Sequence, residues 1–211
     1  MIYLLAGLVY AFLNLDQIAV GPFLLSRPLV VGSIIGAVLG NAPLGFTAGL
    51  SAELMLISVP SSGPAATDLA LIGGLAAFWA VEAYASRGAA VVLALLLAVP
   101  CGWASRRADL LIRRQNDRFG DWIVDGLTAG RERILWKALA TWSALWFVKA
   151  WVVFAAVSFL GLKVVDWCLN RFPLRVLDGL DRGADLFLVV GFAAALSHFW
   201  GRLRPVRTEQ P

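Results

Sequence analysis

Long apolar stretches separated by short charged segments dominate the chain. A first apolar segment covers residues 1–24, and further runs with few charges cover 69–86, 88–104, 134–162 and 186–200. The second and third of these meet at a short turn at Arg87, which predicts two antiparallel spanning helices. The run 134–162 is long enough to cross a bilayer with tilt, at about 1.5 Å per residue. The pattern predicts an all-α polytopic membrane protein.

The segment from Arg27 to Asp68 is also apolar, but it is interrupted. Glycines recur four residues apart at 32, 36 and 40 and again at 45 and 49, a spacing that lets helix backbones approach closely in a membrane. Asn41 and Pro43 then break the helix. Residues 54–67 are uncharged but fewer than the roughly 20 needed to cross a bilayer. We expect a helix, a break and a re-entrant hairpin that carries Glu53 inside the membrane. Such irregular backbone needs protein or water around it, which makes this segment the candidate substrate site.

The charged segments predict how the chain is oriented. Residues 105–133 contain seven arginines, and their apolar positions follow helical spacing, which predicts an amphipathic helix on the cytoplasmic surface. Residues 163–185 balance four basic against four acidic side chains and are expected at the extracytoplasmic interface. We expect a single membrane-embedded domain over 1–211. It would consist of a hairpin-containing core half (1–104), the cytoplasmic helix (105–133) and C-terminal membrane segments (134–211).

Composition agrees with this class and argues against others. Of the 211 residues 60% are hydrophobic and 15% charged, against about 25% charged in ordinary soluble domains. The arginines alternate with acids between membrane segments, which argues against nucleic-acid binding. Two cysteines without a CxxC or Cys/His cluster predict no metal site and no cofactor. The N-terminal segment lacks the features of a cleaved signal and is expected to be a retained helix.

Several stretches, taken in order, resemble one known family. They are RPLVVGSIIGAVLGN (27–41), GFTAGLSAEL (45–54), SGPAATD (62–68), AVPCGWASRRADLLIRRQND (98–117) and FPLRVLDGLDRGADLFLVVGFA (172–193). Their sequence and spacing resemble the IIC membrane component of the mannose/fructose/sorbose family of the phosphoenolpyruvate-dependent sugar phosphotransferase system. Leu24, Ser26 and Asn41 stand where members close to the mannose transporter have Gln, His and Asp. The family usually continues for another pair of membrane segments after the position of Pro211.

The resemblance implies a permease subunit of the bacterial inner membrane that is not itself an enzyme. A hexose or similar sugar would cross between this chain and a IID-type subunit, and a separate cytoplasmic IIAB protein would phosphorylate it. The chain would also contact lipid and form a homo-oligomer. His198 and Cys101 lie within apolar helices and are not expected to carry a phosphoryl group. The alternative is a degenerate, non-transporting homologue that acts as a membrane scaffold or regulator, and a self-contained channel is a third possibility.

Polar groups in and around the interrupted segment are the candidate sugar-binding residues, because ionisable groups inside a membrane default to functional hypotheses. Glu53 would accept hydrogen bonds from sugar hydroxyls, or be tied to a helix N-terminus or to Arg27 for structural reasons. Asp68 matches the acid that ends the family's loop, and it would also cap a helix that begins at Leu69. Lys149 is expected to pair with a buried carboxylate or to extend to an interface. Arg27 is a further candidate, which would clamp an acidic partner or hold the hairpin. The remaining candidates are Ser61, Ser62, Asn41 and Gln17.

Overall fold

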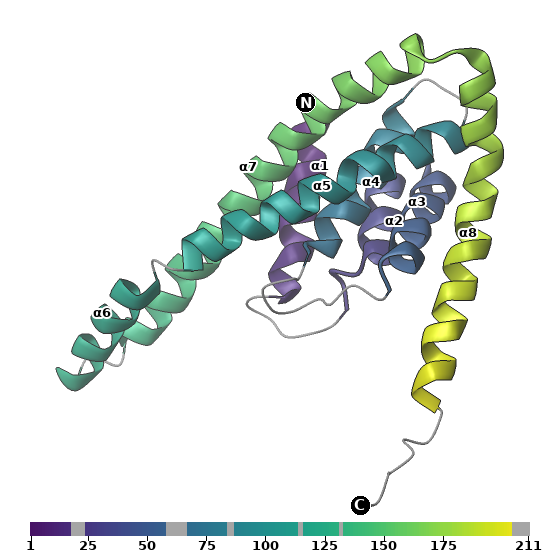
Figure 1. Ribbon diagram of the computed structural model, residues 1–211. Helices are drawn as coiled ribbons and strands as arrows, with labels where there is room; N and C mark the ends of the chain where they lie inside the picture. The colour runs from purple at the N-terminus through teal and green to yellow at the C-terminus, as the bar shows by residue number, and fades with distance from the viewer. Residues whose placement is uncertain (18–23, 58–66, 84–86, 114–115, 131–132, 204–211) are drawn as a thin grey trace, which may run out of the picture.

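The computed structural model describes residues 1–17, 24–57, 67–83, 87–113, 116–130 and 133–203. Over these ranges the chain forms α-helices and one short 3-10 turn, without any strand (Figure 1). The elements are α1 (Ile2–Asn14), η1 (Leu15–Gln17), α2 (Pro28–Val38), α3 (Ala42–Met55), α4 (Leu69–Glu82), α5 (Arg87–Arg113), α6 (Asn116–Thr128), α7 (Arg133–Arg171) and α8 (Leu174–Leu203). The predicted all-α class is confirmed.

Helices α2 and α3 form the interrupted hairpin. Pro28 opens α2, where its missing N–H costs nothing, and Gly40 ends the hairpin's first arm at a φ of +85°, which favours glycine. With 11 and 14 residues the helices are about 16 and 21 Å long, so neither crosses a hydrocarbon core of about 30 Å. The predicted Gly/Pro-broken hairpin is confirmed. Its two arms are α2 and α3, however, whereas the sequence predicted that the whole hairpin follows the break at Asn41 and Pro43.

The glycines of this hairpin face one another across the helix pair. A Cβ added to Gly36 would lie 2.5 Å from the Cα of Gly45, and one added to Gly32 would lie 2.8 Å from the Cα of Gly49. These distances are far below van der Waals contact, so the two backbones touch directly. The predicted role of the four-residue glycine spacing is therefore confirmed.

Helix α4 is the centre of the core. Every residue from Ala70 to Ala80 is buried, and the indole N–H of Trp79 donates to the carbonyl of Ser158 on α7 at 2.9 Å. With 14 residues α4 is about 21 Å long, too short for the spanning helix predicted over 69–86. A helix that is apolar on all sides is typical of burial within protein as well as of a membrane span, and here protein surrounds it.

Within the part of the chain that the structure describes, three helices are long and apolar enough to cross a membrane by length and composition, namely α5, α7 and α8. Helix α5 continues through the predicted boundary at Ser105 to Arg113. Residues 163–185, expected at the extracytoplasmic interface, form the end of α7 and the start of α8, which meet at Phe172 and Pro173. Pro173 has no backbone N–H with which to extend α7, and its carbonyl accepts from the N–H groups of Val176 and Leu177 at the start of α8.

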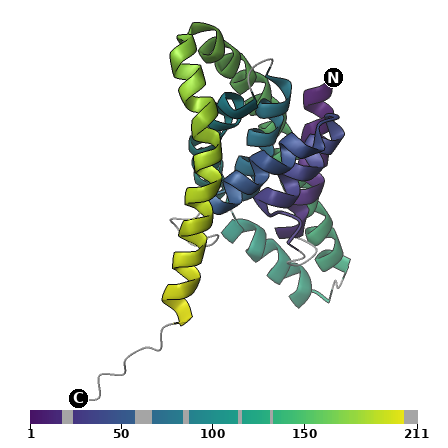
Figure 2. The same cartoon turned by 90° about the vertical axis from the view of Figure 1, so that its right-hand side faces the viewer.

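The amphipathic helix of the charged segment is α6, which is shorter than predicted because residues 105–113 belong to α5. Trp122, Val124 and Leu127 are exposed apolar residues on it, and they share it with Asp121 and Asp125. Both views place α6 and the C-terminal end of α8 at the lower end of the molecule (Figures 1 and 2). The turn between α7 and α8 lies at the upper end, as the predicted orientation requires.

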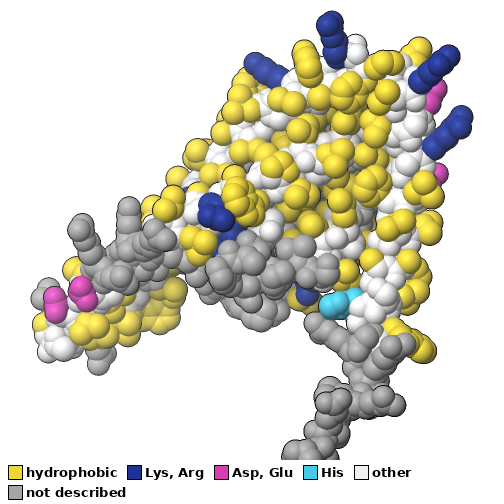
Figure 3. All heavy atoms as spheres, viewed as in Figure 1, with side chains coloured by type: hydrophobic (Ala, Val, Ile, Leu, Met, Phe, Trp, Pro, Cys, Tyr) yellow, Lys and Arg dark blue, Asp and Glu magenta, His cyan; other side chains and the backbone are white. Residues whose placement is uncertain are grey.

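Apolar side chains cover much of the visible surface between these two ends (Figure 3). Exposed large hydrophobic residues include Leu145, Val152 and Leu160 on α7 and Val189 and Phe192 on α8. Surface of this kind is suited to lipid or to other membrane helices, because neither requires polar groups on the contacting face.

Candidate functional site

The carboxylate of Glu53 lies at the N-terminus of α2. Its Oε1 accepts a hydrogen bond from Nη1 of Arg27 at 3.1 Å, and its Oε2 accepts one from the backbone N–H of Leu29 at 3.4 Å. The antiparallel hairpin produces this placement, since it brings the end of α3 beside the start of α2. A helix N-terminus has unpaired N–H groups and partial positive charge, so it favours an anion.

Both members of the Arg27–Glu53 pair remain accessible. The side chain of Arg27 is 53% exposed and that of Glu53 is 23% exposed. An ion pair this open to solvent contributes only about 0.2–1 kcal/mol to stability. The pair therefore offers a partner both a donor, the guanidinium, and an acceptor, the carboxylate.

Asp68 connects three helices. Its Oδ1 accepts from the backbone N–H of Leu71 at 3.0 Å, which makes it the N-cap of α4 as the sequence predicted. Its Oδ2 accepts from the hydroxyl of Tyr10 at 3.3 Å and from the hydroxyl of Ser105 at 3.0 Å. A carboxylate has about four acceptor positions, so one remains for a further donor.

A buried charge cluster continues from Asp68 through Ser105. Nζ of Lys149 donates to Oγ of Ser105 at 3.5 Å and to Oδ1 of Asp109. Nη1 of Arg106 lies 4.0 Å from the other Asp109 oxygen. The side chains of Lys149 and Asp109 are only 13% and 10% exposed. The predicted pairing of Lys149 with a buried carboxylate is thus confirmed, and the pair joins α5 to α7.

The Arg27–Glu53 pair and the Asp68 cluster lie at neighbouring helix ends. Pro28 at the start of α2 packs on Gly73, where an added Cβ would lie 2.5 Å from the Cα of Pro28. Gly73 is five residues beyond Asp68, or about 7.5 Å along α4. The structure therefore places three predicted residues, Arg27, Glu53 and Asp68, in one region of the fold.

The other candidates lie elsewhere or outside the described residues. Asn41 caps α3 at the far end of the hairpin, where its Oδ1 accepts from the N–H of Leu44 at 3.3 Å. Gln17 lies in the 3-10 turn, and the description of the structure does not extend to its side chain. Ser61 and Ser62 fall within 58–66, outside the described residues.

Sequence reasoning missed Tyr10, Ser105 and Asp109. Their partners are between 37 and 58 residues away in the chain, and no local pattern connects residues so far apart. One usable signal was present, because Ser105 and Asp109 are four residues apart and share a face of α5. A lysine in an apolar run, such as Lys149, is expected to pair with an acidic residue, and Asp109 on this face of α5 is such a residue.

Comparison with known sequences gives a consistent match. The family of the PTS system sorbose-specific IIC component matches residues 1–202. The mannose-specific EIIC components of Escherichia coli K12 and of Shigella flexneri are each 28% identical over 184 residues, which is 83% of this chain. The chain spans 65% of the length of those relatives.

Two solved structures share the fold. One chain, described only as a membrane protein, superposes with a TM-score of 0.68 and 23% identity over 94% of this chain and 79% of its own. A second comes from the cryo-EM structure of the mannose transporter ManYZ with microcin E492. It gives a TM-score of 0.63 and 21% identity, with the same two coverages.

Proposed function

Since the chain belongs to the family of sorbose-specific IIC components of the phosphotransferase system, we propose that it is the membrane subunit of a sugar permease. It is a multi-pass protein of the bacterial inner membrane. The sugar would be a hexose or a similar monosaccharide, and it would bind where Glu53 meets the start of α2.

The exposed Arg27–Glu53 pair is the observation that carries this proposal. A sugar hydroxyl both donates and accepts, so it pairs with the Glu53 carboxylate and the Arg27 guanidinium together. The contact with Leu29 holds the carboxylate in place before the sugar arrives. Asp68 would supply a further acceptor from the neighbouring helix end. Ser61, Ser62 and Gln17 stay predicted members of the site, whereas Asn41 caps α3 at the far end of the hairpin.

Transport by such a subunit would depend on other proteins. We infer a IID-type membrane subunit that completes the sugar path, and a cytoplasmic IIAB-type protein that transfers the phosphoryl group. The apolar face of α8 is a suitable contact surface, because only 11% of its most apolar 18-residue stretch is buried within the chain. A second copy of this chain or lipid would cover the remaining apolar faces.

Uptake of radiolabelled mannose and sorbose tests the proposal in cells that lack their own mannose-type permeases. Cells expressing this chain with its IID- and IIAB-type partners should accumulate sugar, and Glu53→Gln should abolish uptake while the subunit still assembles in the membrane. Glu82→Gln is the matched control at the far end of α4 and should transport normally. Normal uptake by Glu53→Gln would remove Glu53 from the site. Uptake without the IID-type subunit would instead favour a self-contained channel.

A further inference from the structure

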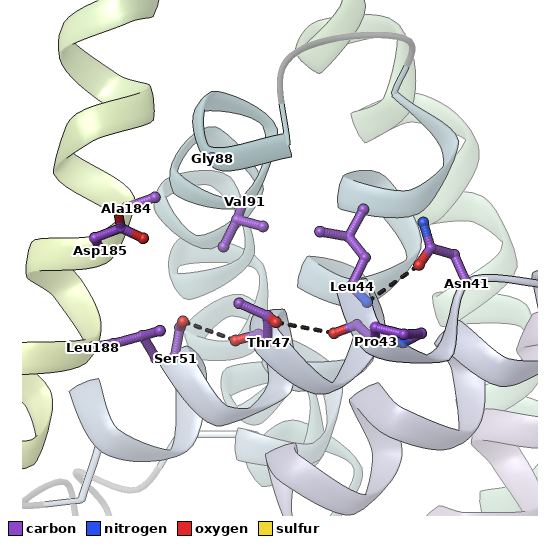
Figure 4. Close-up of a pocket in the computed structure, with 10 residues that line it drawn as sticks. All are labelled: Asn41, Pro43, Leu44, Thr47, Ser51, Gly88, Val91, Ala184, Asp185 and Leu188. Atoms are coloured by element: carbon purple, nitrogen blue, oxygen red, sulfur yellow. Dashed lines mark hydrogen bonds between the residues drawn. The ribbon is translucent and has the colours of Figure 1, made fainter.

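A cavity with a mostly apolar lining lies on the face of α3 that is turned toward α8 (Figure 4). It is open to the surface, has a volume of about 230 Å³ and is bordered by α3, the first turns of α5, and α8. Ser51, which lines it, is two residues from Glu53, and side chains two apart on a helix point to different faces. The cavity is therefore distinct from the Glu53 site, although the two share α3.

The carboxylate of Asp185 is the charged group of this cavity. One turn earlier on α8, Asp181 already accepts hydrogen bonds from the N–H groups of Gly88 at 2.8 Å and Ala89 at 3.3 Å. The carboxylate of Asp185 forms no hydrogen bond or ion pair with any of the described residues. Asp185 is exposed, and it is the last charged residue before the apolar run 186–200 of α8. Its carboxylate oxygens are therefore free to accept hydrogen bonds from a ligand.

Two hydroxyls on α3 add acceptors. The Ser51 hydroxyl donates to the carbonyl of Thr47 at 2.8 Å, and the Thr47 hydroxyl donates to the carbonyl of Pro43 at 2.9 Å (Figure 4). Because their protons are engaged along the helix, both oxygens present lone pairs to a ligand. Asn41 accepts through Oδ1 in its cap, which leaves its NH₂ group as a donor.

These groups select the chemical class of the ligand. Acceptors, one amide donor and the apolar side chains of Val91 and Leu188 suit a molecule with many hydroxyl donors and a C–H face. A metal ion is disfavoured, because no cluster of three metal-binding side chains occurs in the described part of the chain. The volume is below the range of about 300–1,000 Å³ for drug-sized ligands, which favours one monosaccharide over a larger glycoside.

We propose that this cavity is a second sugar site, which a monosaccharide occupies independently of the site at Glu53. The inference rests on the proposed transport function for the identity of the ligand. Asp185, Thr47 and Ser51 accept hydrogen bonds from its hydroxyls, and Asn41 donates one. Sugar held on the α8 side of α3 would be separated from Glu53 by that helix.

Equilibrium binding of D-mannose and L-sorbose to the purified subunit with its IID-type partner, in lipid nanodiscs, tests this. The wild type should bind two sugars per chain. Asp185→Asn should remove one, and so should Ala184→Leu, which fills the cavity without changing charge. Glu53→Gln should remove the other. The controls are Asp178→Asn and Ala193→Leu, exposed residues of the same helix that do not line the cavity, and both should keep two sites.

The outcomes separate this site from the one at Glu53. A single site that survives Asp185→Asn and disappears with Glu53→Gln would overturn the second site and leave the proposed function standing. A single site lost with Asp185→Asn and retained by Glu53→Gln would support the cavity and overturn the Glu53 site. Equal binding by Asp185→Asn, Ala184→Leu and both controls would overturn the cavity outright.

Discussion

Two ion pairs in this protein differ in burial, and burial determines what each does. Arg27 and Glu53 are solvent-accessible and held by few contacts, whereas Lys149 and Asp109 are enclosed between α5 and α7. An exposed pair contributes little to stability and is free to exchange partners. A buried pair leaves an uncompensated charge when one member is removed. The first pair suits ligand binding, and the second holds helices together.

Stability measurements should separate the two pairs. Lys149→Met should lower the free energy of unfolding by at most about 3–5 kcal/mol, because the buried Asp109 carboxylate then keeps only Arg106, at 4.0 Å, as an ionic partner. Arg27→Met should lower it by at most about 1 kcal/mol. Unfolding in a mixture of dodecyl maltoside and sodium dodecyl sulfate, followed by circular dichroism, measures both.

A compensating substitution provides the control for this prediction. Removing the charge of Asp109 as well, in Lys149→Met/Asp109→Leu, should recover part of the lost stability, because the buried carboxylate is gone and only Arg106, which is 19% exposed, loses its partner. If Lys149→Met is no less stable than Arg27→Met, the buried pair is not what joins α5 to α7.

The sequence predicted the local roles of single residues, but it did not identify most of the partners that are far away in the chain. Asp68 was identifiable as a cap because it directly precedes an apolar run. Lys149 in an apolar run predicted pairing with a buried carboxylate. Asp109 was not identified as that partner, because the arginines around it predicted a cytoplasmic surface helix. Tyr10 gave no signal, because a tyrosine in an apolar helix has the same pattern whether or not its hydroxyl has a partner.

Among the elements, the α2–α3 hairpin shows what the spacing of glycines predicts and what it does not. Glycines four residues apart predicted close backbone contact, and the structure has it. Their pairing across the hairpin, Gly36 with Gly45 and Gly32 with Gly49, follows from the turn at Gly40 and was not predicted. The length of α4 and the continuity of α7 through Lys163 were also missed. Hydrophobicity alone does not distinguish burial in protein from burial in lipid, and a charged residue near a membrane surface does not end a helix.

Substitution at the glycine contact should disrupt the hairpin. A Cβ on Gly45 would lie 2.5 Å from the Cα of Gly36 and equally close to the carbonyl oxygen of Gly32. Because both neighbours are backbone, neither yields by a rotamer change, so Gly45→Ala should sharply reduce the yield of monodisperse protein and lower its melting temperature. Fluorescence-detected size-exclusion chromatography after heating measures both effects.

The control is Gly179→Ala on α8. No atom lies within 4 Å of the position of its added Cβ, so this change should be neutral or stabilise the helix by up to about 1 kcal/mol. If the two variants behave alike, the backbones of α2 and α3 do not need direct contact.

For the molecule as a whole, the distribution of basic residues predicts which end faces the cytoplasm. Helix α6 and the end of α8 share one end, and the α7–α8 turn occupies the other (Figures 1 and 2). Seven arginines lie between residues 105 and 133, whereas basic and acidic residues balance near the turn. By the positive-inside rule the α6 end is cytoplasmic. The fold places α6 and the end of α8 at the same end of the molecule. Only the distribution of charges indicates which side of the membrane that end faces.

Cysteine labelling in intact cells tests this orientation. In a background with Cys101 and Cys168 replaced by serine, Thr128→Cys at the end of α6 should resist a membrane-impermeant maleimide until the cells are opened. Asp178→Cys near the start of α8 should react at once. Both positions are exposed, so burial does not limit either reaction. The reverse pattern would invert the protein and place the α6 surface outside, away from any cytoplasmic partner.

The enclosure of α4 also constrains how the protein is made. At about 21 Å this helix is too short to span the lipid core by itself, and one of its central contacts, from Trp79 to Ser158, joins residues 79 apart in the chain. At a synthesis rate of about 5–20 residues per second, roughly 4–16 seconds pass between the emergence of the two residues. During that interval the α7-facing side of α4 needs a temporary cover, so the nascent chain depends on α5 or on an insertase until α7 arrives. A ribosome stalled before residue 158 would therefore leave a membrane intermediate that quality-control proteases can recognise.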